Sequence, residues 1–396
     1  MRDEMKKVPR LRFRGFSEDW ELCKLGTLAE IVRGASPRPI QDSKWFDNTS
    51  DVGWLRISDV TEQNGRIYKL EQKLSKAGQE KTRVLRKPHL LLSIAATVGK
   101  PVVNYVNTGV HDGFLIFLNP LFDREFMFQW LEMFTPKWQK YGQPGSQLNL
   151  NSELVRNQEL RMPSTNEQEK IGMLFQYLDD TITLHQRKLD QLKKLKKAYL
   201  QEMFVSINTK NNKVPKLRFA NFEGNWELCK LENIIEKQIK GKAKVENLCN
   251  GSVEYLDANR LNGGNPIYTK ALPDVSERDI IILWDGSKAG KVYYGFKGVL
   301  GSTLKAYQLK ECANSQFIYQ QLLDNQNNIY NNYRTPNIPH VVKNFSSIFP
   351  IWMTSFEEQS QMADILSNLD NRIILQQNLT DTMISLKKSY LQNMFI

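Results

Sequence analysis

The sequence lacks the features of exported and membrane-bound proteins. It has four cysteines in 396 residues and no C-x-x-C pair, so we expect free, mostly buried thiols rather than disulfides or metal ligands. No stretch approaches the roughly 18 consecutive apolar residues of a membrane span. Residues 1–10 contain no apolar signal-peptide core. These absences predict a soluble, cytoplasmic protein without a membrane partner.

Complete catalytic motifs are also missing. Residues 286–291, GSKAGK, are one residue short of a phosphate-binding loop, and Val292 follows where Ser or Thr is required. There is no H-E-x-x-H, no G-x-S-x-G and no Asn/Asp-Pro-Pro-aromatic tetrapeptide of an amino-methyltransferase. Four histidines have no spacing that would bring metal ligands together: His89, His111, His185 and His340. We therefore expect no catalytic residues, no metal and no cofactor in this chain.

The chain is basic. Lys and Arg number 54 against 43 Asp and Glu, which gives a formal net charge of +11. Such an excess favours a polyanionic partner such as nucleic acid, although the same charge also serves solubility.

What the sequence does contain is a duplication. Residues 8–25, VPRLRFRGFSEDWELCKL, match residues 214–231 at 12 of 18 positions with an offset of 206. Residues 166–204 match residues 357–395 at 16 of 39 positions with an offset of 191. The chain is thus predicted to be two related half-proteins, each ending in a helix. The fall in offset places 15 extra residues in the first half, and we expect them near residues 45–54.

Each half is predicted to be mixed in secondary structure. Short apolar runs such as HLLLSIA at 89–95 and DIIILW at 279–284 alternate with Gly, Asn and Pro clusters, which predicts short strands joined by turns. The segments after them carry apolar residues at spacings of three and four, the pattern of a coiled-coil stripe about 50 Å long. The predicted packing residues are Ile171, Phe175, Leu178, Ile182, Leu189, Leu192, Leu369, Ile373, Met383 and Tyr390, and packing of each helix on its own domain is the alternative.

The order of these motifs resembles that of the specificity subunits of type I restriction-modification systems. VP-x-LRF-x-x-F-x-x-x-WE opens each half, EQ-x-x-I or EQ-x-x-M begins each helix, and KK-x-YLQ-x-MF ends each helix. WLRISDV at 54–60 and QPGSQLNL at 143–150 are also typical of the family. The resemblance covers essentially the whole chain.

This resemblance implies an α+β fold. In such a fold two mixed α/β target-recognition domains would stand in tandem, each followed by a long helix, and the two helices would pack as an antiparallel coiled coil with pseudo-twofold symmetry. The expected segments are a first domain at 1–163, a first helical spacer at 164–205, a linker at 206–213, a second domain at 214–353 and a second helical spacer at 354–396.

The resemblance also implies partners. The two domains would read double-stranded DNA at two half-sites of different sequence, roughly 34 Å or 10 bp apart. The helices would dock two methyltransferase subunits, and restriction/translocase subunits would complete the complex. S-adenosylmethionine, ATP and Mg are expected in those partner subunits.

Candidate DNA contacts are basic, hydroxyl and amide side chains in the loops. In the first domain they are Arg38, Lys44, Lys100, Gln143, Ser146, Gln147 and Asn149. In the second they are Lys242, Lys244, Ser287, Lys288, Lys291, Arg334 and Asn337, with Arg334 the base-reading candidate. An ordinary solvated turn is the alternative for each of them.

Three further features allow more than one interpretation: the basic run, the repeated tryptophans and the function of the whole chain. The basic run at 187–200 is expected to be a solvated helix face first and a methyltransferase-docking surface second. Trp20 and Trp226, which occupy the same repeat position, are expected to anchor packing rather than to stack on bases. Two rival functions are an enzyme that acts alone, against which the missing motifs argue, and a scaffold that binds only protein.

Overall fold

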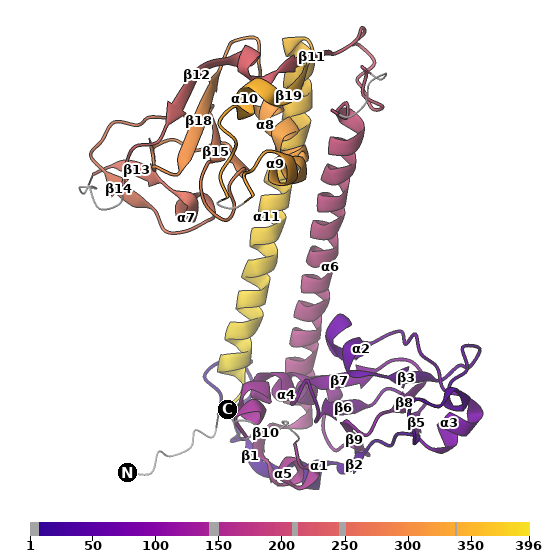
Figure 1. Ribbon diagram of the computed structural model, residues 1–396. Coiled ribbons are helices and arrows are strands. Elements are labelled where there is room, and N and C mark those ends of the chain that lie inside the picture. The colour runs from indigo at the N-terminus through magenta and orange to yellow at the C-terminus, as the bar shows by residue number, and fades with distance from the viewer. Residues whose placement is uncertain (1–7, 142–149, 208–212, 245–250, 337–338) are drawn as a thin grey trace. The chain divides into compact units, whose positions relative to one another are not determined.

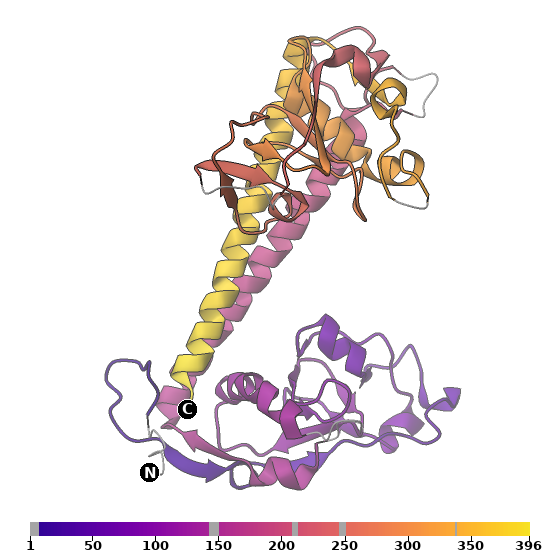
Figure 2. The same ribbon diagram turned by 60° about the vertical axis from the view of Figure 1, so that its left-hand side comes forward.

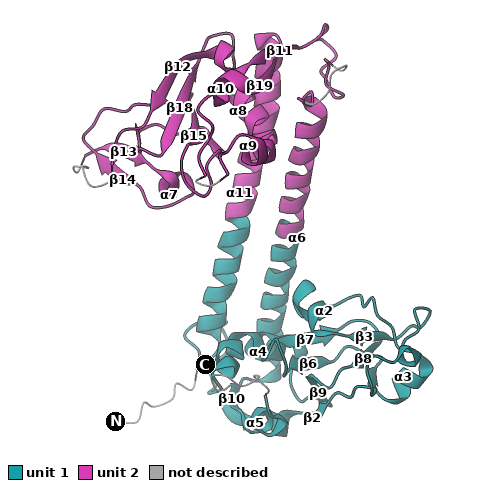
Figure 3. Cartoon of the chain, in the orientation of Figure 1, with its two compact units in different colours: residues 1–185, 379–396 teal, residues 186–378 magenta. Residues whose placement is uncertain are grey.

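The computed structural model describes residues 8–141, 150–207, 213–244, 251–336 and 339–396. The chain forms two compact units, residues 1–185 with 379–396 and residues 186–378 (Figure 3). Helices α6 (Thr165–Met203) and α11 (Phe356–Met394) each contribute to both units. None of the described helices is long and apolar enough to cross a membrane.

The first unit contains a mixed α/β domain (Figure 1). Its main sheet has five strands in the order β2-β9-β6-β7-β4, and a second sheet has the order β3-β8-β5, with bounds given below. The elements are β1 (Glu21–Lys24), α1 (Leu25–Leu28), β2 (Glu30–Arg33), η1 (Ser43–Trp45), β3 (Gly53–Leu55), α2 (Ile57–Glu62), β4 (Arg66–Ile67), α3 (Lys76–Glu80), β5 (Arg83–Leu85), β6 (Leu90–Ser93), β7 (Pro101–Asn104), β8 (Thr108–Val110), β9 (Phe114–Leu118), α4 (Arg124–Trp138), η2 (Gln139–Tyr141), α5 (Ser152–Asn157) and β10 (Glu159–Met162). Every residue of β6 and β7 is buried, as expected for strands covered on both faces.

The second unit contains a related domain. Its main sheet has the order β12-β18-β15-β16, and a small sheet has the order β14-β13-β17. The elements are β11 (Glu227–Lys230), η3 (Leu231–Ile234), β12 (Ile235–Lys240), β13 (Val253–Leu256), α7 (Ala258–Leu261), β14 (Ile267–Thr269), β15 (Ile280–Leu283), β16 (Val292–Tyr293), β17 (Val299–Leu300), β18 (Leu304–Leu309), α8 (Ser315–Asp324), α9 (Gln326–Asn332), α10 (Phe345–Ile348) and β19 (Pro350–Met353). The prediction of two mixed α/β domains in tandem, each followed by a long helix, is confirmed.

The two domains share a strand order and then diverge at one strand. The order β2-β9-β6-β7 of the first domain repeats as β12-β18-β15-β16 in the second. After α2 the first chain segment forms β4, which pairs with β7 and extends the main sheet. After α7 the corresponding segment forms β14, which pairs with β13 in the small sheet instead.

The extra residues of the first domain are not where the sequence suggested. The N-caps of the equivalent helices α2 and α7 are Arg56 and Asp257, an offset of 201. Of the 15 residues, five therefore precede α2 and ten follow it, in the stretch that includes α3 and β5. The expectation that residues 45–54 hold the insertion is thus wrong for most of it, because a difference in offset fixes the number of extra residues and not their position.

A pair of short strands closes each domain at the point where the chain enters and leaves it. Strand β1 pairs antiparallel with β10, and Glu21 lies opposite Met162. Strand β11 pairs with β19 in the same register, with Glu227 opposite Met353. The repeated WELCK sequence therefore builds the entry strand of each domain.

The first turn of α6 binds the entry segment through the repeated Glu-Gln pair. Arg12 donates through Nε and Nη2 to the two carboxylate oxygens of Glu167, both at 2.7 Å, and the Glu167 side chain is fully buried. Gln168 accepts from the Asp123 backbone N–H at 2.9 Å and donates to the Pro163 carbonyl. Since Asp123 caps α4, one dipeptide joins the entry segment, the domain and the long helix.

Helix α11 repeats this arrangement in the second unit. Arg218 donates to both oxygens of Glu358 at 2.7 and 2.8 Å. Gln359 accepts from the backbone N–H of Asn314, the N-cap of α8, at 2.8 Å and donates to the Thr354 carbonyl. The EQ motif is thus explained by two buried clamps of identical design.

The end of each long helix completes the core of a domain. In the first unit Phe395 packs on Phe126 of α4 and on Phe175 of α6, with ring centroids 5.2 and 5.8 Å apart. In the second unit Phe204, the repeat equivalent of Phe395, packs on Phe317 of α8 at 5.3 Å. The first domain is therefore completed by the end of α11, and the second by the end of α6.

Within each unit, segments of α6 and α11 run antiparallel. In the first unit Phe175 meets Phe395 and Asp179 meets Lys387, so residue numbers rise along one helix as they fall along the other (Figures 1 and 2). The Lys387 Nζ lies 2.7 Å from Asp179 Oδ1, and in the second unit Lys196 forms the equivalent ion pair with Asp370. Six of the predicted packing residues on α6 are buried, together with Leu369 on α11, while Ile373, Met383 and Tyr390 are half-buried.

The apolar stripe of α6 is shared between packing partners. Ile171, Phe175 and Leu178 belong to the core of the first domain, where Met383 and Tyr390 of α11 also pack. This part of the stripe therefore packs on the domain and on the other helix at once, so the two interpretations hold together.

We predict that Glu358→Gln reduces the acid sensitivity of the second unit. Burial acts to raise the pKa of Glu358, but hydrogen bonds from Arg218 and Thr354 outweigh it and hold the pKa below its ordinary value of 4.5. A lowered folded-state pKa contributes stability that is present above 4.5 and is lost as the pH falls through the lowered value. The free energy of unfolding can be measured in urea, with tryptophan fluorescence as the probe, at pH values from about 7 to 3. It should show this loss in the wild type.

The variant should lose about 3 kcal/mol at neutral pH, because it leaves Arg218 without a charged partner, and its stability should fall less on acidification. Glu357→Gln is the matched control, since Glu357 is the exposed neighbour. Equal pH dependence of wild type and Glu358→Gln would contradict the assignment.

Candidate nucleic-acid interface

In the second unit, basic side chains gather at one end of the main sheet. Lys240, the last residue of β12, lies opposite Lys305 at the start of β18. Leu283, the last residue of β15, lies opposite Leu304. The loops at residues 241–244, 284–291 and 301–303 therefore meet at this end of the sheet. We name these loops, with Lys240, Lys305 and the described residues of the return segment, 333–336 and 339–341, the second-domain edge.

Backbone hydrogen bonds hold the return segment on the edge. The Val341 N–H donates to the Trp284 carbonyl at 2.9 Å, and the Gly286 N–H donates to the Pro339 carbonyl at 3.0 Å. Gly286 has φ = 109°, a conformation that favours glycine. Two segments more than 50 residues apart in sequence thus form one surface.

Arg334 is tied to the turn that carries Ser287 and Lys288. Its Nη1 donates to the Ser287 carbonyl at 3.2 Å, and its Nε donates to the Tyr330 carbonyl at 2.8 Å. The guanidinium carbon lies 4.8 Å from the centre of the Tyr330 ring. The structure therefore brings together Arg334, Ser287 and Lys288, which the sequence had proposed separately.

The candidate residues of this domain differ in solvent exposure and in side-chain contacts. Lys242 and Lys244 are exposed on the loop after β12, and Ser287 and Lys288 are exposed as well. Lys291 is half-buried, donates to the Asn262 side chain and lies 5.1 Å from the Tyr293 ring centre. Asn337 lies outside the described residues.

Lys305 is a member of this edge that the sequence did not reveal. Its Nζ lies 3.3 Å from the ring centre of Trp284, which is buried. Partial burial and the charge of Lys240 lower the pKa of Lys305, whereas the exposed Asp285 opposes them. Its position is set by strand pairing between residues far apart in sequence, and no local motif marks it.

The first domain presents an equivalent edge with different chemistry. The Leu150 N–H donates to the Ile94 carbonyl at 3.2 Å, which is the counterpart of the Val341 bond to Trp284. The Gly34 N–H donates to the Phe114 carbonyl at 2.9 Å and joins the loop after β2 to the start of β9. We name residues 33–38, 93–100, 111–114 and Leu150 the first-domain edge.

A carboxylate organises the cations of the first-domain edge. Asp112 accepts from Arg38 Nη2 and from Ser36 Oγ, both at 2.8 Å, and its carbonyl accepts from Arg33 Nε at 2.6 Å. Burial acts to raise the pKa of Asp112, but the hydrogen bonds from Ser36 and Arg38 and the nearby His111 lower it on balance. Arg38 keeps a side chain that is 77% exposed, so it remains accessible to a partner.

The other first-domain candidates are placed less uniformly. Lys100 is half-buried in the turn between β6 and β7, and its carbonyl accepts from the Ser93 N–H at 2.9 Å. Lys44 forms an ion pair with Asp42 at 2.9 Å and lies 4.4 Å from the Trp45 ring centre, so its described contacts are not with the first-domain edge. The remaining four lie outside the described residues: Gln143, Ser146, Gln147 and Asn149.

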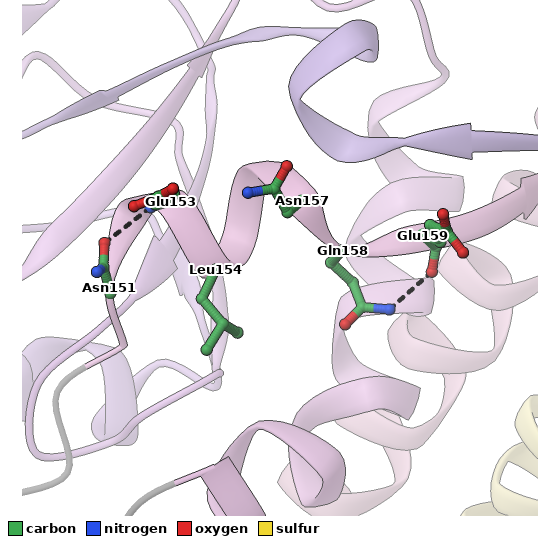
Figure 4. A pocket seen from close by; sticks show the side chains of 6 residues that line it. All are labelled: Asn151, Glu153, Leu154, Asn157, Gln158 and Glu159. Atoms are coloured by element: carbon green, nitrogen blue, oxygen red, sulfur yellow. Dashed lines mark hydrogen bonds between the residues drawn. The ribbon is translucent and has the colours of Figure 1, made fainter.

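A surface pocket beside α5 does not suit a polyanion. It is lined by Asn151, Leu154, Asn157, Gln158 and the carboxylates Glu153 and Glu159 (Figure 4). No cation lines it, so phosphate groups would find no favourable charge there. In the described segments, no group of three His, Cys, Asp or Glu side chains could hold a metal ion.

A family model described as the type I restriction modification DNA specificity domain matches the chain twice, at residues 17–194 and 223–383. The chain belongs to this family. The two matches fall on the two halves of the duplication, so each half is one specificity domain.

Relatives and solved structures agree with this membership. The type I restriction enzyme MjaVIII specificity subunit of Methanocaldococcus jannaschii is 30% identical over an alignment of 179 residues, and the match covers 43% of this chain and 42% of the relative. In this match the chain thus spans less than half the length of the curated relative.

The crystal structure of the S subunit of a type I restriction-modification system from M. genitalium covers 98% of this chain and 99% of its own, with 15% identity and a TM-score of 0.71. A structure described as the basis of complex assembly and conformational transition of a type I R-M system covers 94% of this chain and 96% of its own, with 14% identity and a TM-score of 0.50. At these identities the likeness concerns the fold. The family, by its description, is that of DNA specificity domains of type I restriction-modification systems.

We predict that Lys288→Ala and Lys242→Ala each lower DNA affinity and reduce the slope of log K against log salt by about one. Each lysine is exposed on the second-domain edge and is suited to neutralise one phosphate. Fluorescence anisotropy with a labelled duplex at several NaCl concentrations measures the slope. Lys230→Ala is the control, because Lys230 lies in β11 and pairs with Glu232. An unchanged slope in both edge variants would exclude these contacts.

Proposed function

We propose that this chain selects the DNA site of a type I restriction-modification complex by reading two half-sites of different sequence. The observation that carries this proposal is the pair of edges. They occupy equivalent positions on the same strand order, yet the first presents Arg38 held by Asp112 and the second presents a lysine cluster with Arg334. Because the same frame carries different side chains, an asymmetric, bipartite target is expected.

Different side chains of the edges suit affinity for DNA and specificity for its sequence. Exposed lysines on the second-domain edge suit phosphate oxygens, to which they contribute sequence-independent affinity. The planar guanidinium of Arg334 suits the O6 and N7 acceptors of guanine in the major groove. Arg38 has the same chemistry on the first-domain edge. Each edge thus offers an arginine for base reading, Arg334 in the second domain and Arg38, with Arg33 beside it, in the first.

The long helices suit partner subunits. Large apolar side chains are exposed on them, a feature of surfaces that bind protein. They include Met173, Tyr177 and Leu184 on α6 and Ile374, Leu375 and Leu379 on α11. The charges of the basic run are also exposed, at Arg187, Lys188, Lys193, Lys194 and Lys197. We propose that these faces dock two adenine methyltransferase subunits and that restriction/translocase subunits join the complex.

Catalysis in this proposal belongs to the partners. S-adenosylmethionine is bound by the methyltransferase subunits, and ATP and Mg are used by the restriction/translocase subunits. This chain contributes no catalytic residue. Purified chain mixed with S-adenosylmethionine and target DNA should transfer no methyl group, and addition of the methyltransferase should restore transfer. Methyl transfer by the chain alone would favour an enzyme that acts alone.

We predict that deletion of this gene removes one split adenine-methylation motif from the host genome. Single-molecule sequencing of methylated adenines, with and without the gene, measures this. Exchange of residues 1–163 for the first domain of another family member should change one half-site and leave the other intact, since each edge is built within its own domain.

A change in both half-sites would contradict independent reading. If no motif disappeared on deletion and the chain bound no DNA with or without the methyltransferase, the scaffold that binds only protein would be favoured.

A further inference from the structure

The two domains differ in how they are fixed to the long helices. Strand β4 extends the main sheet of the first domain, and its residue Arg66 reaches from that sheet to α4 and α6. In the second domain the corresponding segment forms β14 in the small sheet. The difference in topology therefore has a difference in contacts as its consequence.

Arg66 makes a dense set of contacts. Its Nη1 and Nη2 donate to the two carboxylate oxygens of Glu125 at 3.1 and 2.8 Å, and Nη2 also donates to Asp179 Oδ2 at 3.1 Å. The guanidinium carbon lies 4.4 Å from the ring centre of Phe128. The side chain is 12% exposed. Burial opposes the charge of Arg66, but the Glu125 carboxylate outweighs it and raises the pKa, so the guanidinium stays charged.

Asp179 is the point at which Arg66 joins the helices. Gln129 Nε2 donates to Asp179 Oδ2 at 2.8 Å, and Lys387 Nζ lies 2.7 Å from Asp179 Oδ1. One carboxylate of α6 therefore binds the sheet through Arg66, α4 through Gln129 and α11 through Lys387. These four side chains belong to the same unit.

The second unit repeats this group without the arginine. Asp370, the repeat equivalent of Asp179, accepts from Gln320 Nε2 at 2.8 Å and pairs with Lys196. Gln316 stands at the position equivalent to Glu125. Among the residues that the structure describes in this unit, no arginine contacts Asp370. The aspartate–lysine pair, which both units share, joins the two helices. Arg66, which only the first unit has, joins the sheet of the first domain to α6.

We propose that Arg66 is a positioning residue for DNA recognition: it fixes the orientation of the first-domain edge on α6 and thereby sets the half-site spacing that the chain accepts. The inference rests on the proposed function. Bidentate arginine–carboxylate pairs are directional as well as strong, so they resist rotation of the sheet about the helix. A change of one base pair in the spacer moves a half-site by about 3.4 Å and turns it by about 35°. If the first domain is rigidly attached to α6, DNA with an altered spacer should bind more weakly. If the attachment is looser, the domain can reorient and the loss of affinity should be smaller.

The test measures affinity for three duplexes in the complex of the full chain with its methyltransferase. The duplexes carry the two half-sites found by methylation mapping, with the native spacer, one base pair less and one more. For the wild type we expect affinity for the native spacer to exceed that for the others by about tenfold or more, the cost of a typical mismatch. For Arg66→Gln we expect this ratio to fall by about threefold or more, because the amide cannot bridge Glu125 and Asp179.

Two further variants separate positioning from folding. Arg56→Gln is the control, since Arg56 pairs with Asp59 within the same domain at 3.0 Å and touches neither long helix in the contacts described. It should keep the wild-type ratio. Arg66→Lys keeps the charge without the fork, so its ratio should lie between those of Arg66→Gln and the wild type. Unfolding midpoints of all variants show whether each is folded, and Arg66→Lys carries the test if Arg66→Gln is not.

The outcomes are distinguishable. If every duplex binds more weakly in folded Arg66 variants and the ratio is unchanged, Arg66 has a structural role only and the inference is overturned. If the wild type shows no preference for any spacer, the proposed bipartite reading fails instead.

Discussion

A carboxylate buried in the first turn of each long helix is the constraint on which the architecture depends. Glu167 and Glu358 are almost inaccessible to solvent, and an unpaired charge in such a place would be strongly destabilising. Arg12 and Arg218 from the entry segments supply a bidentate partner in each case. The chain therefore enters a domain and leaves it at one fixed point. Everything between the entry strand and the closing strand can change in length without moving that point, as the 15 extra residues of the first domain show.

A second constraint joins the two halves of the sequence. The first domain needs Phe395 from the end of α11, and the second needs Phe204 from the end of α6. Each domain core therefore contains residues from both repeats, and truncation of either helix end would leave a cavity lined by aromatic rings. The interhelical pairs Asp179–Lys387 and Lys196–Asp370 follow the same logic, because each helix supplies one acid and one base at equivalent positions. The two repeats thus make equivalent contacts as well as having similar sequences.

The frame was predictable from the sequence, and much of the candidate interface was not. Identical residues at the offsets of 206 and 191 revealed the entry segments, the Glu-Gln pairs and the helix ends. In both halves the Trp of the entry segment, the Glu-Gln pair and the Phe that follows the helix are buried, so a change at these positions would disturb packing. Lys305 and Arg66 were missed because their roles come from pairing between strands distant in sequence. Arg334 was found as a polar loop residue, but its contact with the Ser287 turn depends on a return segment that no local pattern marks. The fold class follows from motif order, whereas the edges need three-dimensional strand order.

Substitutions at buried and at exposed residues differ in their cost to stability, which explains how such a molecule can acquire new recognition surfaces. Loss of an ion pair such as Arg218–Glu358 would lower the free energy of unfolding by several kcal/mol, because it leaves a buried charge without a partner. Exchange of an exposed side chain such as Lys242 or Lys288 is usually within about 0.5 kcal/mol of neutral for stability. The exposed side chains of the edges can therefore vary with little effect on the stability of the fold. Arg66 stands between these classes, since its side chain is only 12% exposed and yet it belongs to the first domain alone. Variation at such a position would alter how a recognition surface is presented and leave the surface itself unchanged.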